Sequence, residues 1–407
     1  MKYIFLTGLY PKEYEFFFKD NARSGSIQNA PNVFQWNVVD GLIANGAIFW
    51  VLSAPFISTY PKGYKRVSIP SFPIVYNQKV IGETVSFCDL IGLKESSICH
   101  SVEKGILSWI KNSAIQATDK FAIITYTPLS FFLNAVKRIK KKYPQAIVCS
   151  IVTDLIEDAH NFKVNQNVLK RIQIAIEKKK EHQNFQIIDK FVLLSKTMGE
   201  RIPEAVEESI VVEGIAIVPD QVPQGSKNET YKSLLYTGSL HEFSGIKLLI
   251  QAFEKTDNKN YRLIICGIGS CEDYIKEEAK KDGRIVFKGN LSREEAIKEQ
   301  HNATALINPR QPIEEITKYS FPSKTMEYLS SGTPMIGYRL EGIPKEYYDY
   351  FYSPNDNSIE DLAQTIDRVL SLNSDELQKK GEKAFNFIKD NKNSKVQVGR
   401  IINYIEQ

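Results

Sequence analysis

The chain has few cysteines and no long hydrophobic run. Its most apolar segment, Ala47–Ile57, is about half of the ~20 residues that a membrane-spanning helix needs. Met1–Tyr10 begins with a lysine and an apolar patch, but Lys12 and Glu13 follow, and no small-residue cleavage site is present. We therefore expect a cytoplasmic protein, peripheral at most to the inner face of a membrane.

The five cysteines show no CxxC spacing, and no Asp-x-Asp pair occurs. Cys149 and Cys266 lie in apolar runs, where a cysteine acts as a small core residue. The first absence argues against a structural zinc site, and the second removes the usual ligands of a metal-bridged diphosphate. We expect no metal and no cofactor.

A strong excess of one charge is also missing. The net charge is +4, well below the dense basic clustering of a nucleic-acid binder, so we expect no nucleic-acid partner. Lys137–Tyr143 and Lys178–Lys180 are local basic runs, and Phe16–Phe18 is an aromatic one. The basic runs are either solvated helix faces or surfaces that rest on anionic lipid headgroups. The aromatic run either packs in the core or forms an apolar patch that faces an acceptor substrate.

Short apolar runs alternate with amphipathic stretches along the whole chain. This alternation predicts parallel sheets with crossover helices, an α/β fold of two Rossmann-like, doubly wound domains. The helical stretches include Phe34–Ile43, Phe131–Lys142 and Ile246–Lys255. The predicted strands are Tyr3–Thr7, Ile48–Ser53, Ala122–Tyr126, Ala146–Val152, Phe191–Ser195, Leu234–Thr237, Arg262–Cys266, Ile285–Lys288, Ala305–Asn308 and Met335–Tyr338.

One polar segment, rich in proline, interrupts this pattern at 218–230, and we predict a linker there. It separates an N-terminal domain at 1–217 from a C-terminal domain at 231–390. A last helix at 391–407 is expected to pack back on the N-terminal domain. Ligands of doubly wound sheets bind beyond the carboxyl ends of the strands, so two facing domains would enclose one cleft.

The clearest site candidate is Lys318–Ile336, which reads as a helix start after a predicted strand. Pro322 suits the first helical position and Ser320 a cap. Free N–H groups, the Ser323 hydroxyl group and the Lys324 ammonium group suit a diphosphate. Glu327, on the same face, can accept hydrogen bonds from a ribose diol. The alternative is a helix with a surface Lys–Glu pair.

Three glycine-containing loops also follow strands in the C-terminal half. They contain Gly238 with Ser239, Gly267, and Gly289. Glycine lets the backbone approach a phosphate closely, although each loop alone is equally typical of a tight turn. No complete GxGxxG follows a strand, which argues against a dinucleotide oxidoreductase.

The N-terminal half offers acceptor-side candidates. Asp154, Asp158 and His160 follow a predicted strand, and they either orient and deprotonate an acceptor hydroxyl group or cap a helix as solvated groups. Ser26 and Gln28 lie between the first strand and a helix, in an acceptor-docking loop or a flexible one.

Four segments together resemble the large retaining glycosyltransferase family 4 of bacterial polysaccharide enzymes, which has the GT-B fold. The segments are Tyr236–Leu240, Ser244–Phe253, Asn308–Arg310 and Phe321–Pro334. The resemblance implies a donor site in the C-terminal domain. It implies that Glu327 binds the donor ribose, that Ser323 and Lys324 lie at the diphosphate, and that Gly238 and Ser239 lie beneath the phosphates.

The chain departs from the family pattern at three positions. Ser239 and Ser244 stand where basic residues are common, and Tyr319 stands where the first of two glutamates would fall. Arg310, Lys318 or Lys247 can supply the missing charge. We predict Arg310, because it follows a strand.

These observations predict a metal-independent, retaining glycosyltransferase that uses a nucleotide-diphosphate sugar, with UDP the expected nucleotide. The acceptor would be a sugar or a polyprenyl-linked oligosaccharide in surface-polysaccharide assembly. Asp154, Arg310 and Lys324 would be catalytic. The alternatives are a non-catalytic partner subunit of a glycosyltransferase complex and a nucleotide-sugar epimerase of the same fold.

Overall fold

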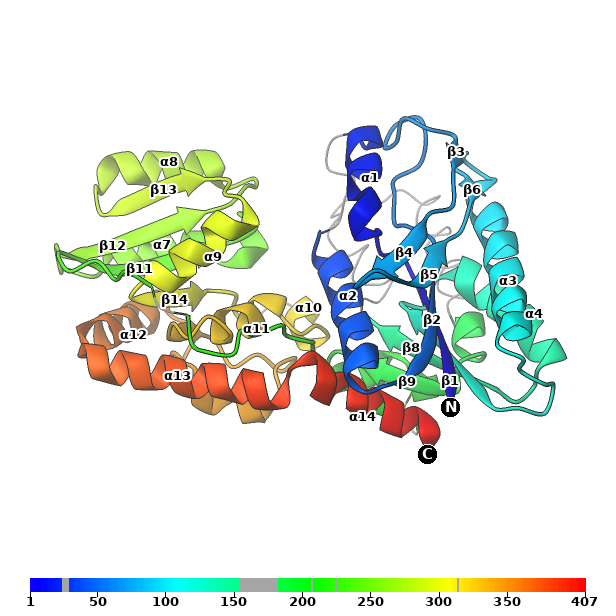
Figure 1. Cartoon of the computed structure of the whole chain (residues 1–407). Coiled ribbons are helices and arrows are strands. Elements are labelled where there is room, and N and C mark those ends of the chain that lie inside the picture. Colours follow the sequence, from blue (N-terminus) through cyan, green and yellow to red (C-terminus); the bar gives the residue numbers. More distant parts are fainter. Residues whose placement is uncertain (24–28, 154–181, 206–207, 224, 313–314) are drawn as a thin grey trace. The chain divides into compact units, whose positions relative to one another are not determined.

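The computed structural model describes residues 1–23, 29–153, 182–205, 208–223, 225–312 and 315–407. They form two compact units (Figure 1). The first unit spans Met1–Leu194, Met198–Ile215 and Ser394–Gln407, and the second spans Ser195–Thr197 and Ala216–Asn393.

The first unit is built on an eight-stranded sheet in the order β10-β9-β8-β7-β1-β2-β5-β4. All neighbours pair in parallel except β4 and β5, which form an antiparallel hairpin at one edge. The order reverses between β1 and β7, as in a doubly wound fold. The strands are β1 (Lys2–Thr7), β2 (Ile48–Ser53), β4 (Pro73–Tyr76), β5 (Lys79–Thr84), β7 (Phe121–Tyr126), β8 (Ala146–Val152), β9 (Lys190–Leu193) and β10 (Ser209–Val211).

Alternate residues of β1 point into two separate cores, because successive side chains of a strand face opposite sides of the sheet. Ile4 and Leu6 pack with α3 (Lys94–Asn112) and α4 (Ser130–Lys142). Tyr3 and Phe5 pack with α2 (Asn29–Ala44) and α14 (Ser394–Glu406). Both faces of the sheet are therefore covered by helices, as the near-continuous apolar strands require.

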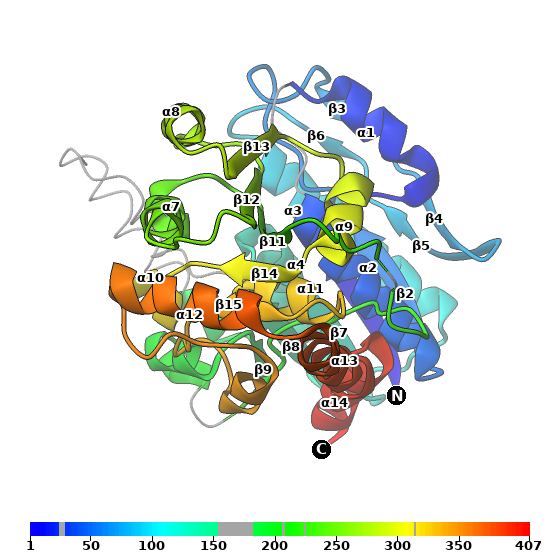
Figure 2. The same ribbon diagram turned by 90° about the vertical axis from the view of Figure 1, so that its left-hand side faces the viewer.

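Two smaller elements lie at one end of this unit. They are α1 (Glu15–Asn21), which follows the 3₁₀ turn Lys12–Tyr14, and the short antiparallel pair β3 (Ser68–Ile69) and β6 (Phe87–Cys88). Figures 1 and 2 both place them at the end opposite the N-terminus.

The second unit has a five-stranded parallel sheet in the order β13-β12-β11-β14-β15. This order reverses between β11 and β14. Figure 2 shows α7 and α9 on opposite sides of the sheet. The elements are β11 (Lys232–Thr237), α7 (Ile246–Glu254), β12 (Tyr261–Cys266), α8 (Glu272–Lys281), β13 (Ile285–Gly289), α9 (Arg293–Asn302), β14 (Ala305–Asn308), α10 (Glu315–Lys318), α11 (Ser323–Leu329), β15 (Met335–Gly337), α12 (Ile359–Ser371) and α13 (Ser374–Asn391), with 3₁₀ turns at Glu242–Ser244 and Lys345–Tyr350.

The segment predicted as a linker, 218–230, belongs to the second unit. The chain passes between the units at Leu194–Ser195, Thr197–Met198, Ile215–Ala216 and Asn393–Ser394. Lys227 explains why the segment is held there. Its ammonium group donates to the carbonyl groups of His301 and Ala303 at 2.7 and 2.5 Å. Burial lowers its pKa to about 8.

Helix α11 begins one residue later than predicted. Pro322 is its cap residue rather than its first helical residue, and it occupies the cap position that was predicted for Ser320. Ser323, exposed, is the first helical residue. None of the described helices is both long and apolar enough to cross a membrane.

Candidate active site

A pocket of about 390 Å³ lies at the carboxyl ends of β11 and β12 in the second unit. It brings together five of the seven residues predicted to bind the donor, namely Gly238, Ser239, Gly267, Lys324 and Glu327. Gly289 and Ser323 lie beside the lining: the Gly289 carbonyl group accepts from the Gly267 N–H at 2.7 Å, and Ser323 precedes Lys324.

The floor of this pocket is backbone, because two of its glycines have no room for a side chain. A Cβ atom on Gly267 would overlap the carbonyl oxygen of Gly238, and one on Gly238 would overlap the end of the Lys324 side chain. Both residues also have positive φ values, 143° and 149°, which L side chains rarely adopt. The Lys324 ammonium group therefore rests directly against the Gly238 backbone.

Lys324 is a largely enclosed cation without an anionic partner. Among the described residues no carboxylate lies within ion-pair distance of it, and its nearest aromatic neighbours are the rings of Tyr236 and Tyr328, at 5.7 and 5.9 Å from Nζ. Burial lowers the pKa of Lys324, and the charge of Glu327 partly opposes this shift. A desolvated cation of this kind favours an anionic ligand in the pocket.

Glu327 is exposed, but its carboxylate is held in place by a buried glutamine. Gln300, on α9, donates to Glu327 Oε1 at 2.5 Å and to Thr237 Oγ1 at 3.1 Å. The Tyr328 hydroxyl group fixes the same strand end, since it accepts from Thr237 N–H at 2.9 Å and donates to Thr237 O at 3.0 Å. These bonds orient one carboxylate oxygen and leave the other for a ligand.

Arg310 follows β14 at the same edge of the sheet and is half-buried. Burial raises the pKa of Tyr236 to about 12, while hydrogen bonds with Ser244 and Ser239 and the charge of Arg310 act in the opposite direction. The Ser239 and Ser244 hydroxyl groups, at positions where basic residues were expected, lie 3.2 Å apart. Arg310 thus lies close to the position of the missing charge. Lys247, by contrast, pairs with Glu242 at 2.7 Å.

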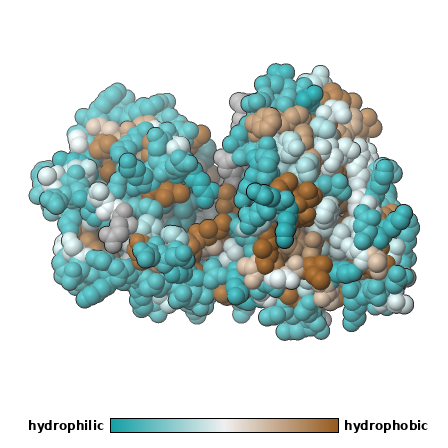
Figure 3. Space-filling model, viewed as in Figure 1, coloured by the Kyte–Doolittle hydropathy of each residue, from teal (hydrophilic) through white to brown (hydrophobic). Residues whose placement is uncertain are grey.

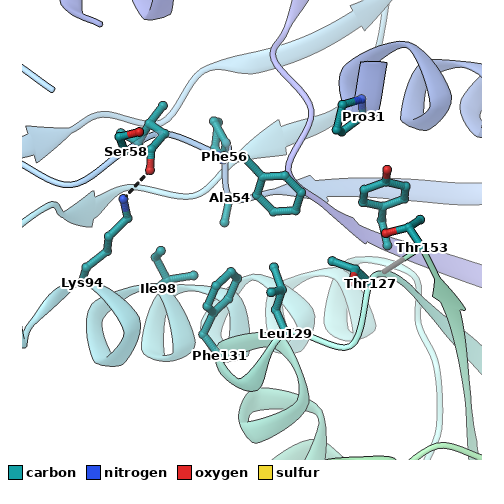
Figure 4. A pocket seen from close by; sticks show the side chains of 13 residues that line it. Pro31, Ala54, Phe56, Ser58, Lys94, Ile98, Thr127, Leu129, Phe131 and Thr153 are labelled. Carbon is teal, nitrogen blue, oxygen red and sulfur yellow. Dashed lines mark hydrogen bonds between the residues drawn. The ribbon is translucent and has the colours of Figure 1, made fainter. Parts of the chain in front are cut away.

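A second pocket of about 390 Å³ lies at the carboxyl ends of β2, β7 and β8 in the first unit (Figure 4). Large apolar side chains dominate its lining, including Phe56, Ile98 and Phe131. Lys94 closes one end. Its ammonium group pairs with the fully buried Asp89 at 2.7 Å and donates to Ile57 O at 2.6 Å.

The opposite end of this pocket carries the hydroxyl groups of Thr127 and Thr153. Thr127 directly follows β7 and has φ 60°, a left-handed conformation that is strained for a β-branched residue. Its N–H donates to Ile151 O at 2.8 Å, which holds the turn. Strain of this kind costs about 1–3 kcal/mol and is concentrated at ligand sites.

The predicted acceptor-side residues Ser26, Gln28, Asp154, Asp158 and His160 lie outside the described residues. Thr153, which lines the pocket, immediately precedes Asp154. Sequence reasoning missed the pocket's other described residues, and it missed Gln300. A buried glutamine at the end of a polar helix carries no periodic signal, and the pair of Asp89 with Lys94 at the start of α3 carries none either.

Comparison with known proteins identifies the fold of the chain and the family of its second unit. Residues 217–387 match the family described as Glycosyl transferases group 1. A lipopolysaccharide outer core galactosyltransferase, WaaB, is similar over 100% of this chain and 99% of its own, with 14% identity and a TM-score of 0.62. Residues 217–387 therefore carry a glycosyltransferase group 1 domain, and the chain as a whole has the GT-B fold of the structures that it resembles.

Two further structures resemble this chain over its whole length. A glycosyltransferase from Rickettsia africae has 14% identity, a TM-score of 0.60 and 98% of its chain covered. An E. coli structure, trehalose-6-phosphate bound with UDP-2-fluoro glucose, has 10% identity, a TM-score of 0.62 and 99% covered. No curated protein sequence matches the chain. The neighbours confirm the predicted doubly wound fold class.

Proposed function

We propose that this glycosyltransferase transfers a sugar from a UDP-sugar, with retention of anomeric configuration and without a metal ion. The acceptor is a glycan or a lipid-linked glycan in surface-polysaccharide assembly at the cytoplasmic face of a membrane. The cation of Lys324 carries the proposal, because it lies in one pocket with the glycine backbone and with Glu327, and no carboxylate of the described residues is within ion-pair distance of it.

The chemistry follows from where charge develops. When the bond between the sugar and the diphosphate breaks, negative charge grows on the leaving phosphate oxygens, and preorganised cations stabilise it. Lys324 supplies one such charge from the pocket. Arg310, at the end of the neighbouring strand, supplies a second, which makes a bridging metal unnecessary.

Glu327 binds the ribose of the donor in this proposal. Its oriented carboxylate accepts hydrogen bonds from two adjacent hydroxyl groups, which a nucleotide presents on its ribose. Gly238 and Gly267 let the phosphates approach the backbone. The E. coli neighbour bound with UDP-2-fluoro glucose supports UDP as the nucleotide.

Calorimetric titration of the full chain with UDP tests the donor site. We expect binding, weakened about 100-fold in Lys324→Met, since hydrogen bonds to charged groups contribute about 1.5–3 kcal/mol. Glu327→Gln should weaken it about tenfold. The control, Lys280→Met, removes an exposed lysine from α8 of the same unit and should leave UDP affinity unchanged. Equal affinity in Lys324→Met and Lys280→Met would refute the proposed site.

Turnover is the second test. UDP release measured with several UDP- and GDP-sugars, with and without glycan acceptors, identifies the donor. Arg310→Ala should lower this release. Unchanged turnover and unchanged donor binding in Arg310→Ala would remove that residue from the mechanism. The anomeric configuration of the product, read by NMR, tests retention.

A further inference from the structure

The loop that follows β11 is fastened to the loop that follows β12, and this fixes where His241 lies. Leu240 N–H donates to Ile268 O at 2.9 Å, and Cys271 N–H donates to Leu240 O at 2.8 Å. His241 comes directly after Leu240 and lines the second-unit pocket. The histidine is therefore presented to the pocket from a backbone that the neighbouring loop holds in place.

Two contacts orient the imidazole ring of His241. Its Nδ1 lies 3.3 Å from the Ser270 hydroxyl oxygen, and the ring stacks on that of Phe243, with 5.5 Å between the centroids and 19° between the planes. His241 also precedes the 3₁₀ turn Glu242–Ser244, but its side chain makes no capping hydrogen bond there. The other ring nitrogen, Nε2, has no hydrogen-bond partner among the described residues, so it is available to a ligand.

The ring that supports His241 is itself exposed. On the face of the second unit seen in Figure 3, most of the surface is hydrophilic, and hydrophobic residues form small groups. Phe243, 36% exposed, is one of three exposed large apolar side chains that the structure describes in this unit, with Ile217 and Ile268. An aromatic ring stabilises a fold most when it is buried, so the place of Phe243 is better explained by its contact with His241 than by the core.

The charge balance of the pocket shows why a histidine matters there. Of the described side chains that line it, only Lys324, Glu327 and His241 can carry charge near neutral pH, because burial raises the pKa of Cys266 to about 11. With a neutral imidazole, the charges of Lys324 and Glu327 cancel. A sugar diphosphate brings two negative charges, and a protonated His241 would give the lining the net positive charge that such an anion favours.

His241 also lies in the loop where positive charge is missing. Ser239 and Ser244 stand at the two positions where the family resemblance led us to expect basic residues. Their hydroxyl groups lie 3.2 Å apart, and the Tyr236 hydroxyl group donates to Ser239 O at 2.8 Å, so neutral polar groups occupy these positions. Within 238–244, His241 is the one residue that can become a cation.

The charged groups near His241 come from three elements. On its own loop, Glu242 pairs with Lys247 at 2.7 Å. At the start of α8, the Glu272 carboxylate accepts from Gly269 N–H at 3.1 Å. The lysine and the glutamate of α11 line the pocket with it. No carboxylate of the described residues lies within ion-pair distance of the imidazole, so a bound phosphate would be its first anionic partner.

We propose that His241 is a donor-binding residue, which as an imidazolium donates from Nε2 to the diphosphate of the sugar donor and adds a positive charge to that of Lys324. This inference rests on the proposed function, because it adds a contact to the same donor site. It makes donor affinity depend on pH, since histidine changes its charge between about pH 5 and 8. The protonated ring attracts the diphosphate, so affinity falls as the pH rises through this range.

Calorimetric titration of the full chain with UDP at two pH values tests the inference. His241→Gln keeps a neutral hydrogen-bond donor but loses the charge, so UDP affinity relative to the parent should fall about tenfold at about pH 6 and less than about twofold at about pH 9. The phosphate of UDP itself titrates near about pH 6, but this cancels because parent and variant are compared at the same pH. Equal affinities at both pH values, or equal losses at both, would overturn the inference.

Two matched variants serve as controls. His100→Gln removes an exposed histidine from α3 of the first unit, and it should bind UDP as the parent does at both pH values. His241→Lys keeps a cation at this position, so its UDP affinity should stay within about threefold of the parent at about pH 6 and should change little at about pH 9. A loss in His241→Lys as large as that in His241→Gln at the lower pH would show that charge is not what the ring contributes, and would overturn the inference.

Uridine, which has no phosphate, separates charge from stacking. It should bind the parent and His241→Gln equally. A loss for uridine as large as that for UDP would show that the ring stacks on the base, and would overturn the inference. The two proposals also fail in different ways: a parent chain that does not bind UDP refutes the proposed function, whereas UDP binding that His241→Gln leaves unchanged refutes the role of His241 alone.

Discussion

The two pockets have the same volume and the same place in their sheets, yet their walls are made of different things. In the second unit the backbone of Gly238 and Gly267 forms part of the wall, which would let phosphates approach the chain closely. In the first unit it is made of side chains such as Phe56 and Phe131. One topology thus provides a site whose ligand is set by the backbone and another whose ligand is set by side-chain identity.

The lysines in the two pockets differ in the same way. Lys94 is neutralised by Asp89 and holds its own loop in place. Lys324 has no carboxylate within ion-pair distance among the described residues, so its charge is available to a ligand. A lysine in a pocket is therefore evidence for an anion site only when its counter-ion is missing.

The largest expected effect concerns the first unit. Lys94→Met leaves the fully buried Asp89 without its partner, which costs about 3–5 kcal/mol of unfolding free energy. Urea unfolding of the full chain should show this loss, while UDP affinity without denaturant stays unchanged. Arg138→Met is the control, because its pair with Glu103 is exposed on the arginine side and contributes less than about 1 kcal/mol. A fall in UDP affinity in Lys94→Met would contradict the contrast between a structural Lys94 and a ligand-binding Lys324.

An intermediate effect is expected from the backbone floor of the second pocket. Gly238→Ala places a methyl group where the end of Lys324 lies, at a strained φ, and should weaken UDP binding about tenfold. Gly283→Ala is the matched control, since nothing lies within 4 Å of its added Cβ atom. Titration with UDP compares the two. Similar affinities would mean that the ligand does not need this floor.

The smallest effect should come from the support of Glu327. Gln300→Leu removes the donor that orients its carboxylate but leaves the carboxylate itself to bind the ligand, so UDP affinity should fall only about threefold. Gln378→Leu, on the exposed face of α13, should have no effect. If Gln300→Leu weakened binding as strongly as Glu327→Gln, Gln300 would be a ligand rather than a support.

Much of the fold followed from hydrophobic periodicity. The predicted strand Tyr3–Thr7 corresponds to β1 at Lys2–Thr7, and Ala146–Val152 matches β8. The hairpin β4–β5 was missed. It begins with Pro73, which disfavours a strand, and its turn uses Asn77 and Gln78, both with positive φ, instead of a glycine pair.

The second-unit pocket was predictable in outline because parallel strands end at the same edge of a sheet. Loops after β11 and β12 therefore had to meet, and the spacing of Lys324 and Glu327 placed both on one side of α11. The details depended on contacts distant in sequence. Gln300 reaches Glu327 from another helix, at a separation of 27 residues in the sequence. No local sequence pattern predicts a contact of this kind.

Helix α14 places the end of this sequence within the unit that begins it. Val398 and Ile401 fill the core beneath α2, and the Tyr3 hydroxyl group donates to Glu406 at 2.6 Å. During synthesis, one face of the first unit's sheet therefore stays incompletely covered until residues 394–407 have left the ribosome. The second unit, a continuous stretch from Ala216 to Asn393 apart from Ser195–Thr197, has nearly all of its chain available earlier. A nascent chain stalled before Ser394 would thus expose apolar residues and be a natural target for chaperones.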